Sequence, residues 1–531
     1  MASPRPLQAA VVLSALYFLS RLIGFVQTAL INSILPPGAT DAYYAAFAIP
    51  EFVNYLVAGG ALSITFIPIF TSLQQSGRER EAWRFFSTVA TVMGGVLILL
   101  LIIAEFAARP MVAFARTGLL ERPEVFDLAV AMTRVLLPAQ WFFYIGGLLV
   151  GVLNAYKRFG ASGWTGAVYN IAAIVVALVL LQFNVGPISF AWGILIGAFL
   201  GNLLLPFLAA KNAPPEQRPQ FSFALDLASP HVRKYFINAI PIMIGVSLPV
   251  VDQIVVGRFA SYLPEGAITH LTTGNRVMIA AQGIVGQAAS VAAFPYLAAF
   301  AAQENWTEYS RFLREGLRRM IFLTLPLSVL MILLSRPIIT LLFGYGQFNN
   351  ERALQETAVA FAFYCIGLFA WTTLQLVARG FYAMQDTLTP TIIGSALTIF
   401  FFIPLIWAAA KWGGVLGLAL ATSIGATAHL LATSIALENR LSRRPYSAPI
   451  RLDKIAGLTL RTICACILMA VAGHITRTLL LEVLPDGKPG AILQIAIVGT
   501  ISCLAFGFSA RRFSIPEWNW IEAKFMARLR R

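Results

Sequence analysis

The chain has 531 residues, of which 58% are hydrophobic and 12% are charged, and its mean hydropathy is +0.76. Soluble domains are about 45–50% apolar and about 25% charged, so this composition excludes a soluble protein and indicates a polytopic membrane protein. The formal net charge is +15. Basic residues concentrated in cytoplasmic loops explain this charge better than nucleic-acid binding does, and we expect no nucleic-acid partner.

The apolar segments predict an all-α fold with about fourteen transmembrane helices, since one span needs about 20 mostly apolar residues. Several segments contain Pro or Gly, which neighbouring helices in a bundle can accommodate. In chain order the predicted spans are 9–35, 42–73, 86–108, 127–155, 161–183, 187–210, 235–258, 267–300, 317–343, 354–384, 388–410, 414–438, 455–481 and 489–510.

The connections between these segments differ strongly in basic residues. One set, which includes the connections around 78–84, 311–319 and 440–454, is rich in Arg and Lys, whereas the alternate set has few. By the positive-inside rule, we expect both termini in the cytoplasm. Residues 511–531 form a basic tail, and its apolar residues recur at helical spacing. The tail therefore fits a helix on the anionic inner leaflet, with a disordered basic tail as the alternative.

A weak internal repeat divides the chain. "LPPGATDAYYAAFAIPEF" begins at Leu35 and "LPEGAITHLTTGNRVM" at Leu263, while "GVLNAYKRFGASG" begins at Gly151 and "GFYAMQDTLTPT" at Gly380. Both pairs have nearly the same offset, which predicts two six-helix lobes. An even number of helices per copy gives a parallel repeat, whose lobes enclose a central cavity and rock to expose it to either side.

The repeat predicts five regions along the chain. They are an N-terminal lobe (1–211), a cytoplasmic linker (212–234), a C-terminal lobe (235–440), two further helices (441–510) and the basic tail (511–531).

Charged residues inside the apolar segments are the candidate functional residues. Arg21 lies in the first predicted helix and Arg276 in the eighth, whereas Asp41 opens the second and Asp252 lies in the seventh. Such residues usually face a bundle interior or a water-filled cavity. Two guanidinium groups in one cavity would bind a phosphate or pyrophosphate group. Alternatively, each arginine pairs with a carboxylate and only joins helices, and the spacing does not separate these two hypotheses.

Other chemistry has weaker support. Asp252 has oxygen-bearing neighbours and is a possible cation site, although a structural hydrogen-bonded aspartate fits equally well. The four cysteines and four histidines show no zinc or catalytic spacing. There is no Walker-type nucleotide loop and no nucleophile–base pair, so we expect neither ATP-driven transport nor an enzyme.

Several motifs together resemble the MurJ/MviN family of lipid II flippases, within the multidrug/oligosaccharidyl-lipid/polysaccharide exporter superfamily. They are "SRLIGFVQTAL", "GATDAYYAAFAIPEF", "GGALSITFIPIF", "GVLNAYKRF", "NRV", "LLFGYGQF" and "ARGFYAMQDTLTPT". The resemblance covers nearly the whole chain. It implies fourteen helices in two lobes around a cationic cavity, with the last two helices forming a groove for a lipid tail.

The resemblance also implies a task and a site. The task is to move an undecaprenyl-pyrophosphate-linked peptidoglycan precursor across the bacterial inner membrane. Arg21 and Arg276 match the family's cavity arginines, Asp41 matches its acidic residue at the start of helix 2, and Asp252 is a weaker match to its sodium ligand. Gln27 and Asn54 stand where many members carry basic residues, and we include both among the predicted substrate-binding residues. The pattern also differs at Glu51, Tyr55 and Gly59.

These departures put the substrate in question more than the fold. The favoured hypothesis is a lipid II flippase that works by alternating access, functions as a monomer among membrane lipids and has no cofactor beyond possible Na⁺ or H⁺ coupling or dependence on membrane potential. The alternatives are a flippase for another polyprenyl-linked glycan, a cation-coupled exporter of small molecules, and a membrane scaffold for envelope enzymes.

Overall fold

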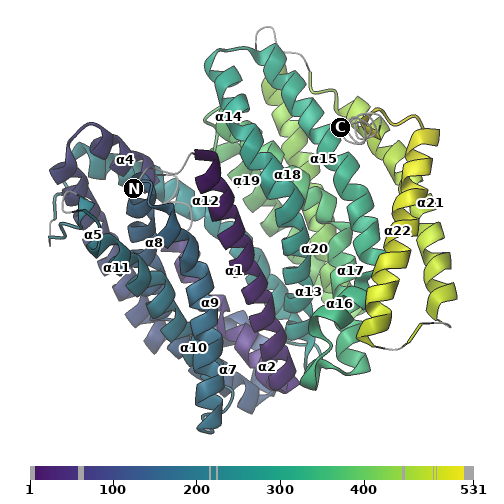
Figure 1. The fold of residues 1–531 in the computed structure, drawn as a ribbon, viewed down its shortest axis with the longest axis horizontal. Helices are drawn as coiled ribbons and strands as arrows, with labels where there is room; N and C mark the ends of the chain where they lie inside the picture. The colour runs from purple at the N-terminus through teal and green to yellow at the C-terminus, as the bar shows by residue number, and fades with distance from the viewer. Residues whose placement is uncertain are drawn as a thin grey trace. The chain divides into compact units, whose positions relative to one another are not determined.

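The structure is a computed structural model, and it describes residues 6–57, 65–214, 217–222, 225–444, 449–481, 484–485 and 487–518. Every regular element within these ranges is a helix, which confirms the all-α prediction (Figure 1). The chain divides into two compact units, Met1–Ile268 and Thr269–Arg531.

Unit 1 contains long helices and several short ones that continue them after a break. Its elements are α1 (Pro6–Ile34), α2 (Pro37–Ala46), α3 (Ala48–Val57), α4 (Ile67–Gln75), α5 (Glu79–Phe106), α6 (Ala108–Ala115), η2 (Thr117–Glu121), α7 (Pro123–Leu136), α8 (Ala139–Ala155), α9 (Phe159–Gln182), α10 (Ser189–Gly197), η3 (Ala198–Leu204), α11 (Leu205–Lys211) and α12 (Pro230–Ala260).

Unit 2 repeats this organisation and adds two helices. Its elements are α13 (Ala267–Gln282), which begins just before the boundary, η5 (Gly283–Gln287), α14 (Ala288–Ala302), α15 (Trp306–Leu333), α16 (Ser335–Phe343), η6 (Gly346–Phe348), α17 (Glu351–Ile366), α18 (Leu368–Ala383), α19 (Leu388–Leu397), η7 (Thr398–Phe402), α20 (Ile403–Ser442), α21 (Leu452–Leu481) and α22 (Lys488–Arg512).

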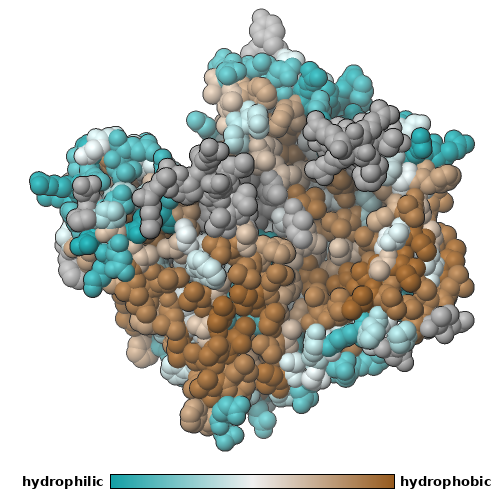
Figure 2. Space-filling model, in the orientation of Figure 1, coloured by the Kyte–Doolittle hydropathy of each residue, from teal (hydrophilic) through white to brown (hydrophobic). Residues whose placement is uncertain are grey.

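The surface of the helices is that of a membrane protein. Among the described residues, nine helices are long and apolar enough to cross a bilayer, and the pair α17 and α18, bent by 42°, would make a tenth. Figure 2 shows hydrophobic residues along the sides of the helices, as on α21 and α22, and hydrophilic residues at their ends. A polytopic membrane protein is confirmed, and the count of fourteen spans stays a prediction.

The element bounds follow the internal repeat. Helix α5 begins at Glu79 and α15 begins at Trp306, 227 residues later, while α7 begins at Pro123 and α17 at Glu351, 228 residues later. The two arginines also repeat, whereas their acidic partners are at different positions of the following helix. Arg109 pairs with Asp127 at 2.7 Å, and Arg336, which follows Arg109 by 227 residues, pairs with Glu351 at 2.6 Å.

The predicted span 317–343 is wrong as a single helix, because α15 ends at Leu333 and a separate helix, α16, begins at Ser335. Pro337 explains this break. Its ring would clash with the carbonyl four residues earlier, which is that of Leu333, and it has no N–H to donate. The Leu333 carbonyl instead accepts from Arg477 Nη1 at 3.4 Å. Pro110 stands at the equivalent place in the first repeat, after the end of α5 at Phe106.

The predicted spans 388–410 and 414–438 meet at a sharp reversal. Gly414 has φ +53° and ψ −136°, a conformation that is essentially restricted to glycine, and it divides α20 into two helical arms. A Cβ at Gly417 would contact the Ala409 carbonyl oxygen, so the arms approach closely at the turn. The predicted boundary between these two spans is therefore confirmed.

Helix α12 packs within unit 1. Val232, Tyr235 and Ala239 belong to the same apolar core as residues of α5 and α8. The chain before α12 is also attached to α5, because the Ser222 N–H donates to Ser87 Oγ at 3.1 Å. The first turn of α12 lies inside the segment predicted as linker 212–234, and the other predicted region boundaries stay predictions.

The start of the basic tail is packed in unit 2. Ile515 is buried, Trp518 contacts the Phe506 ring edge-on, and Glu517 pairs with Arg318 at 2.7 Å. Residues 519–531 lie outside the described part of the chain, so the amphipathic helix predicted there stays a prediction.

Candidate functional site

The predicted substrate ligand Arg21 lies on α1, on an exposed part of that helix. Its neighbour Ser20 faces α9, where Asn170 Nδ2 donates to the Ser20 carbonyl at 3.0 Å. Asn170 is buried, so this bond fixes how α1 packs on α9 around Arg21. Gln27 lies further along α1 and is half-buried. Sequence reasoning missed Asn170, which is a lone amide in an apolar run.

Asn54, the second position that departs from the family pattern, lies on α3 and is half-buried. Its Nδ2 donates to Gln140 Oε1 at 2.9 Å, and Gln140 Nε2 donates to the Leu136 carbonyl at 3.2 Å. Gln140 is buried on α8. The two amides therefore form a neutral hydrogen-bonded chain that joins α3 to α8. Gln140 was also missed, although it is a polar residue two positions after Pro138 in an apolar segment.

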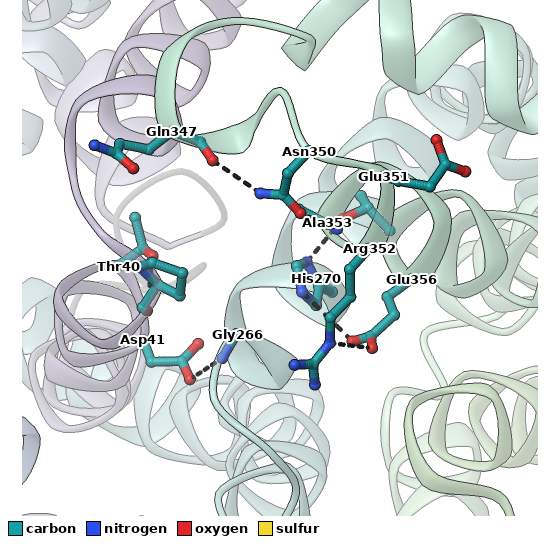
Figure 3. Close-up of polar contacts among 12 residues, drawn as sticks. Thr40, Asp41, Gly266, His270, Gln347, Asn350, Glu351, Arg352, Ala353 and Glu356 are labelled. Atoms are coloured by element: carbon teal, nitrogen blue, oxygen red, sulfur yellow. Dashed lines mark hydrogen bonds and ion pairs between the residues drawn. The ribbon is translucent and has the colours of Figure 1, made fainter.

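Asp41 is fully buried on α2 and lies at the turn between α12 and α13. Its Oδ2 accepts the Gly266 N–H at 2.8 Å, as Figure 3 shows, and Arg122 Nη1 lies 3.8 Å from the same oxygen. Gly266 directly precedes α13, so the carboxylate lies at a helix N-terminus, where a negative charge is favourable. The structure thus places Asp41 in a helix-capping contact, and its role in substrate binding stays a prediction.

Arg122 binds the other side of the same turn. Its Nη2 donates to the Ser261 carbonyl at 2.9 Å, just after the end of α12. A cation at a helix C-terminus is favourable for the same electrostatic reason as the carboxylate at an N-terminus. The guanidinium of Arg122 thus stabilises the end of α12 and the carboxylate of Asp41 stabilises the beginning of α13. Each charge is opposite in sign to the partial charge of the helix end that it contacts.

The remaining predicted residues lie on helices that flank this turn. Asp252 is half-buried on α12, and Arg276 is half-buried on α13. Within the described ranges, no group of three or more His, Cys, Asp or Glu side chains is arranged to hold a metal ion. The sodium-ligand role of Asp252 stays a prediction. Arg21 belongs to unit 1 and Arg276 to unit 2, and their convergence on one cavity also stays a prediction.

A polar cluster in unit 2 was not expected from the sequence. Buried His270 on α13 lies 3.0 Å from Thr357 Oγ1 through Nδ1, and 3.5 Å from Glu356 Oε2 through Nε2. Arg352 in turn donates to Glu356 at 2.9 Å (Figure 3). The cluster joins α13 to α17. Its members are far apart in sequence, and only the Arg352–Glu356 spacing of four residues gave a signal.

A family model described as "Lipid II flippase MurJ" matches residues 37–485. The chain belongs to this family. A lipid II flippase MurJ from Burkholderia cenocepacia is 29% identical over 84% of this chain and 86% of that protein. A probable lipid II flippase MurJ from Buchnera aphidicola is 29% identical over 72% of this chain and 74% of that protein.

Solved structures agree on the fold. A lipid II flippase MurJ in an inward closed conformation matches with a TM-score of 0.73, at 20% identity, over 94% of this chain and 99% of that one. An inward-facing multidrug resistance MATE family transporter of the MOP superfamily matches with a TM-score of 0.60, at 14% identity, over 82% of this chain and 98% of that one. The predicted MurJ-type fold and its superfamily neighbours are therefore confirmed.

Proposed function

We propose that this chain is a lipid II flippase of the bacterial cytoplasmic membrane. It would move the undecaprenyl-pyrophosphate-linked peptidoglycan precursor from the inner to the outer leaflet by alternating access, as a monomer with both termini in the cytoplasm. The match of the family model to residues 37–485 supports this proposal, and so does the identity to a named lipid II flippase over most of both chains.

The arginines are the residues that would bind the substrate. A cation in a membrane helix costs about 2.5–3.5 kcal/mol on insertion scales, which makes Arg21 on the apolar helix α1 a candidate functional residue. A pyrophosphate would bind to it favourably, because its oxygens match the planar donors of a guanidinium. The Asn170–Ser20 bond holds α1 in place during binding. Arg276 would bind the same group from the second lobe.

The neutral pair Asn54–Gln140 changes how the substrate would be held. Where many relatives have cations, this chain has amides that donate hydrogen bonds without net charge. We therefore propose that binding depends less on salt than in a site with more arginines, because fewer charges are screened. Na⁺ or H⁺ would bias the conformational equilibrium only through a difference in affinity between the two states, with Asp252 as the residue to test.

The test is replacement of the native lipid II flippase in a bacterium that depends on it. We would express the wild type, Arg21→Ala, Arg276→Ala and, as a matched control, Arg311→Ala, which removes the same side chain from an exposed position. Lipid II in the outer leaflet would be measured by its cleavage with an externally added toxin. We expect rescue by the wild type and the control, and loss of rescue in both other variants at equal expression.

Two outcomes would contradict the proposal. Full activity of Arg21→Ala and Arg276→Ala would refute the role of the arginines. A well-expressed wild type that does not rescue would refute lipid II as the substrate and favour another polyprenyl-linked glycan. Efflux of cationic dyes by the same cells would instead favour a cation-coupled exporter.

A further inference from the structure

Arg116 is a buried cation outside the predicted substrate site. It follows α6, is 6% exposed, and donates from Nη1 to the Ala115 carbonyl at 2.8 Å and to the Ile254 carbonyl at 3.1 Å. The second of these carbonyls belongs to α12, so the side chain bridges α6 and α12. Within the described part of the chain, Arg116 Nε has no hydrogen-bond partner. The guanidinium is therefore desolvated but incompletely satisfied.

Gly257 makes this contact possible. A Cβ added to Gly257 would overlap the Cζ, Nη1 and Nη2 atoms of Arg116. Gly257 lies one turn after Ile254 on α12, so the guanidinium packs against the helix backbone where a side chain is missing. A glycine inside a helix is normally unfavourable by about 1 kcal/mol relative to alanine. Here the close approach of Arg116 accounts for it.

The surrounding charges favour the cation at this place. The contact lies near the C-terminal end of α12, where a positive charge is favourable. Burial lowers the pKa of Arg116 to about 10, and the negative charge of Glu51 on α3 opposes this effect. Arg116 thus remains charged at neutral pH. Leaving α12 would let water reach its unpaired Nε, which partly offsets the loss of the two carbonyl contacts.

We propose that Arg116 and Gly257 are positioning residues for transport: their contact holds the outer half of α12 against α6, and its release is a step of the transport cycle. The transport part of this proposal rests on the proposed function. The contact matters because α12 carries Asp252 and is joined through one turn to α13, which carries Arg276. Its position therefore sets the position of Asp252, which lies on the same helix.

The contact is tested directly by a cysteine reporter that does not depend on transport. Ala260 is 1% exposed at the end of α12, so Ala260→Cys, in a protein whose four native cysteines are replaced, should react slowly with a water-soluble maleimide. We expect Gly257→Ala and Arg116→Ala each to raise the labelling rate about tenfold, because each removes a charge-assisted buried contact. The intact helix would be checked by hydrogen exchange over residues 250–261 without the reporter.

A matched control separates the contact from helix propensity. Gly95 lies inside α5 and a Cβ there would meet no atom within 4 Å, so Gly95→Ala makes the same chemical change in open space. It should leave labelling unchanged. The double variant Arg116→Ala/Gly257→Ala should label no faster than Arg116→Ala alone, because Gly257 acts only through the guanidinium. Arg116→Lys should label at an intermediate rate, because it keeps the charge and loses the planar fork.

The outcomes distinguish the proposal from the function on which it rests. If folded Gly257→Ala labels like the wild type, or if the two substitutions add in the double variant, the contact does not hold α12. If labelling changes as expected but lipid II transport by Gly257→Ala equals that of the wild type, the transport role is refuted and the contact is only structural. If the wild type transports no lipid II, the proposed function fails while the labelling result still stands.

Discussion

Removing the buried carboxylate of Asp41 should open the beginning of α13 locally. Asp41 is 0% exposed and accepts the Gly266 N–H, whereas Arg122, 24% exposed, lies 3.8 Å away. Asp41→Ala leaves that N–H buried without its partner. Hydrogen bonds to charged groups contribute about 1.5–3 kcal/mol, so amide exchange over 266–270 should become about tenfold to a hundredfold faster. Asp41→Asn keeps an acceptor of the same shape, so its amide exchange rate over 266–270 should lie between those of the wild type and Asp41→Ala.

Asp127 provides the control for this prediction. It lies closer to its arginine than Asp41 does, at 2.7 Å from Arg109, but it is 58% exposed. Exposed ion pairs contribute about 0–1 kcal/mol, so Asp127→Ala should change exchange at the start of α7 by less than about fivefold. Hydrogen exchange with mass spectrometry, under conditions where rates report local opening, measures both segments in one experiment. Equal effects of the two substitutions would refute the argument that burial, rather than distance, determines the contribution.

Two further predictions concern the hydrogen-bonded side chains of unit 1. Gln140→Leu leaves the Asn54 amide without its acceptor and should lower the free energy of unfolding by about 1–3 kcal/mol. The double variant Asn54→Leu/Gln140→Leu removes both partners, so its midpoint of thermal unfolding should be closer to that of the wild type. Equal losses of stability in the single and double variants would refute a stabilising hydrogen bond between the two amides. Burial, followed by the Glu79 carboxylate, raises the pKa of Tyr156 to about 12. Because the folded-state pKa exceeds the unfolded value, this contribution to stability is complete below about pH 10 and is lost as pH rises toward 12. Tyr156→Phe should remove that part of the pH dependence, and an ultraviolet titration of the wild type that shows no tyrosine ionising near pH 12 would refute it.

The sequence predicted the helices better than it predicted their ends. Apolar length identified α9, α21 and α22 within a few residues, because hydrocarbon thickness imposes a common length on membrane spans. The same criterion wrongly predicted α15 and α16 as one helix, because a hydropathy average does not detect the loss of one backbone N–H at Pro337. Proline and glycine positions, rather than hydropathy, therefore decide where these helices break.

The candidate site could be predicted only in part. Charges in apolar segments are energetically unfavourable in a membrane, which is why Arg21, Asp41 and Arg276 became candidates, and their roles in substrate binding stay predictions. The partners were not identified, because Asp41 and Gly266 are 225 residues apart and the Gly266 contact uses a backbone N–H, which every residue except proline possesses. His270 was set aside as scattered for the same reason, since its contacts lie on a different helix.

The internal repeat also shows where the two copies stop being equivalent. The motifs that begin at Leu35 and Leu263 align Asp41 with Thr269, so the buried carboxylate has no acidic counterpart in the second copy. The next position is Ala42 in the first copy and His270 in the second, where the histidine contacts Thr357 of α17. The two copies thus share their helix positions but differ in their buried polar side chains, and the carboxylate of Asp41, which caps α13, corresponds to the hydroxyl of Thr269 in the second copy.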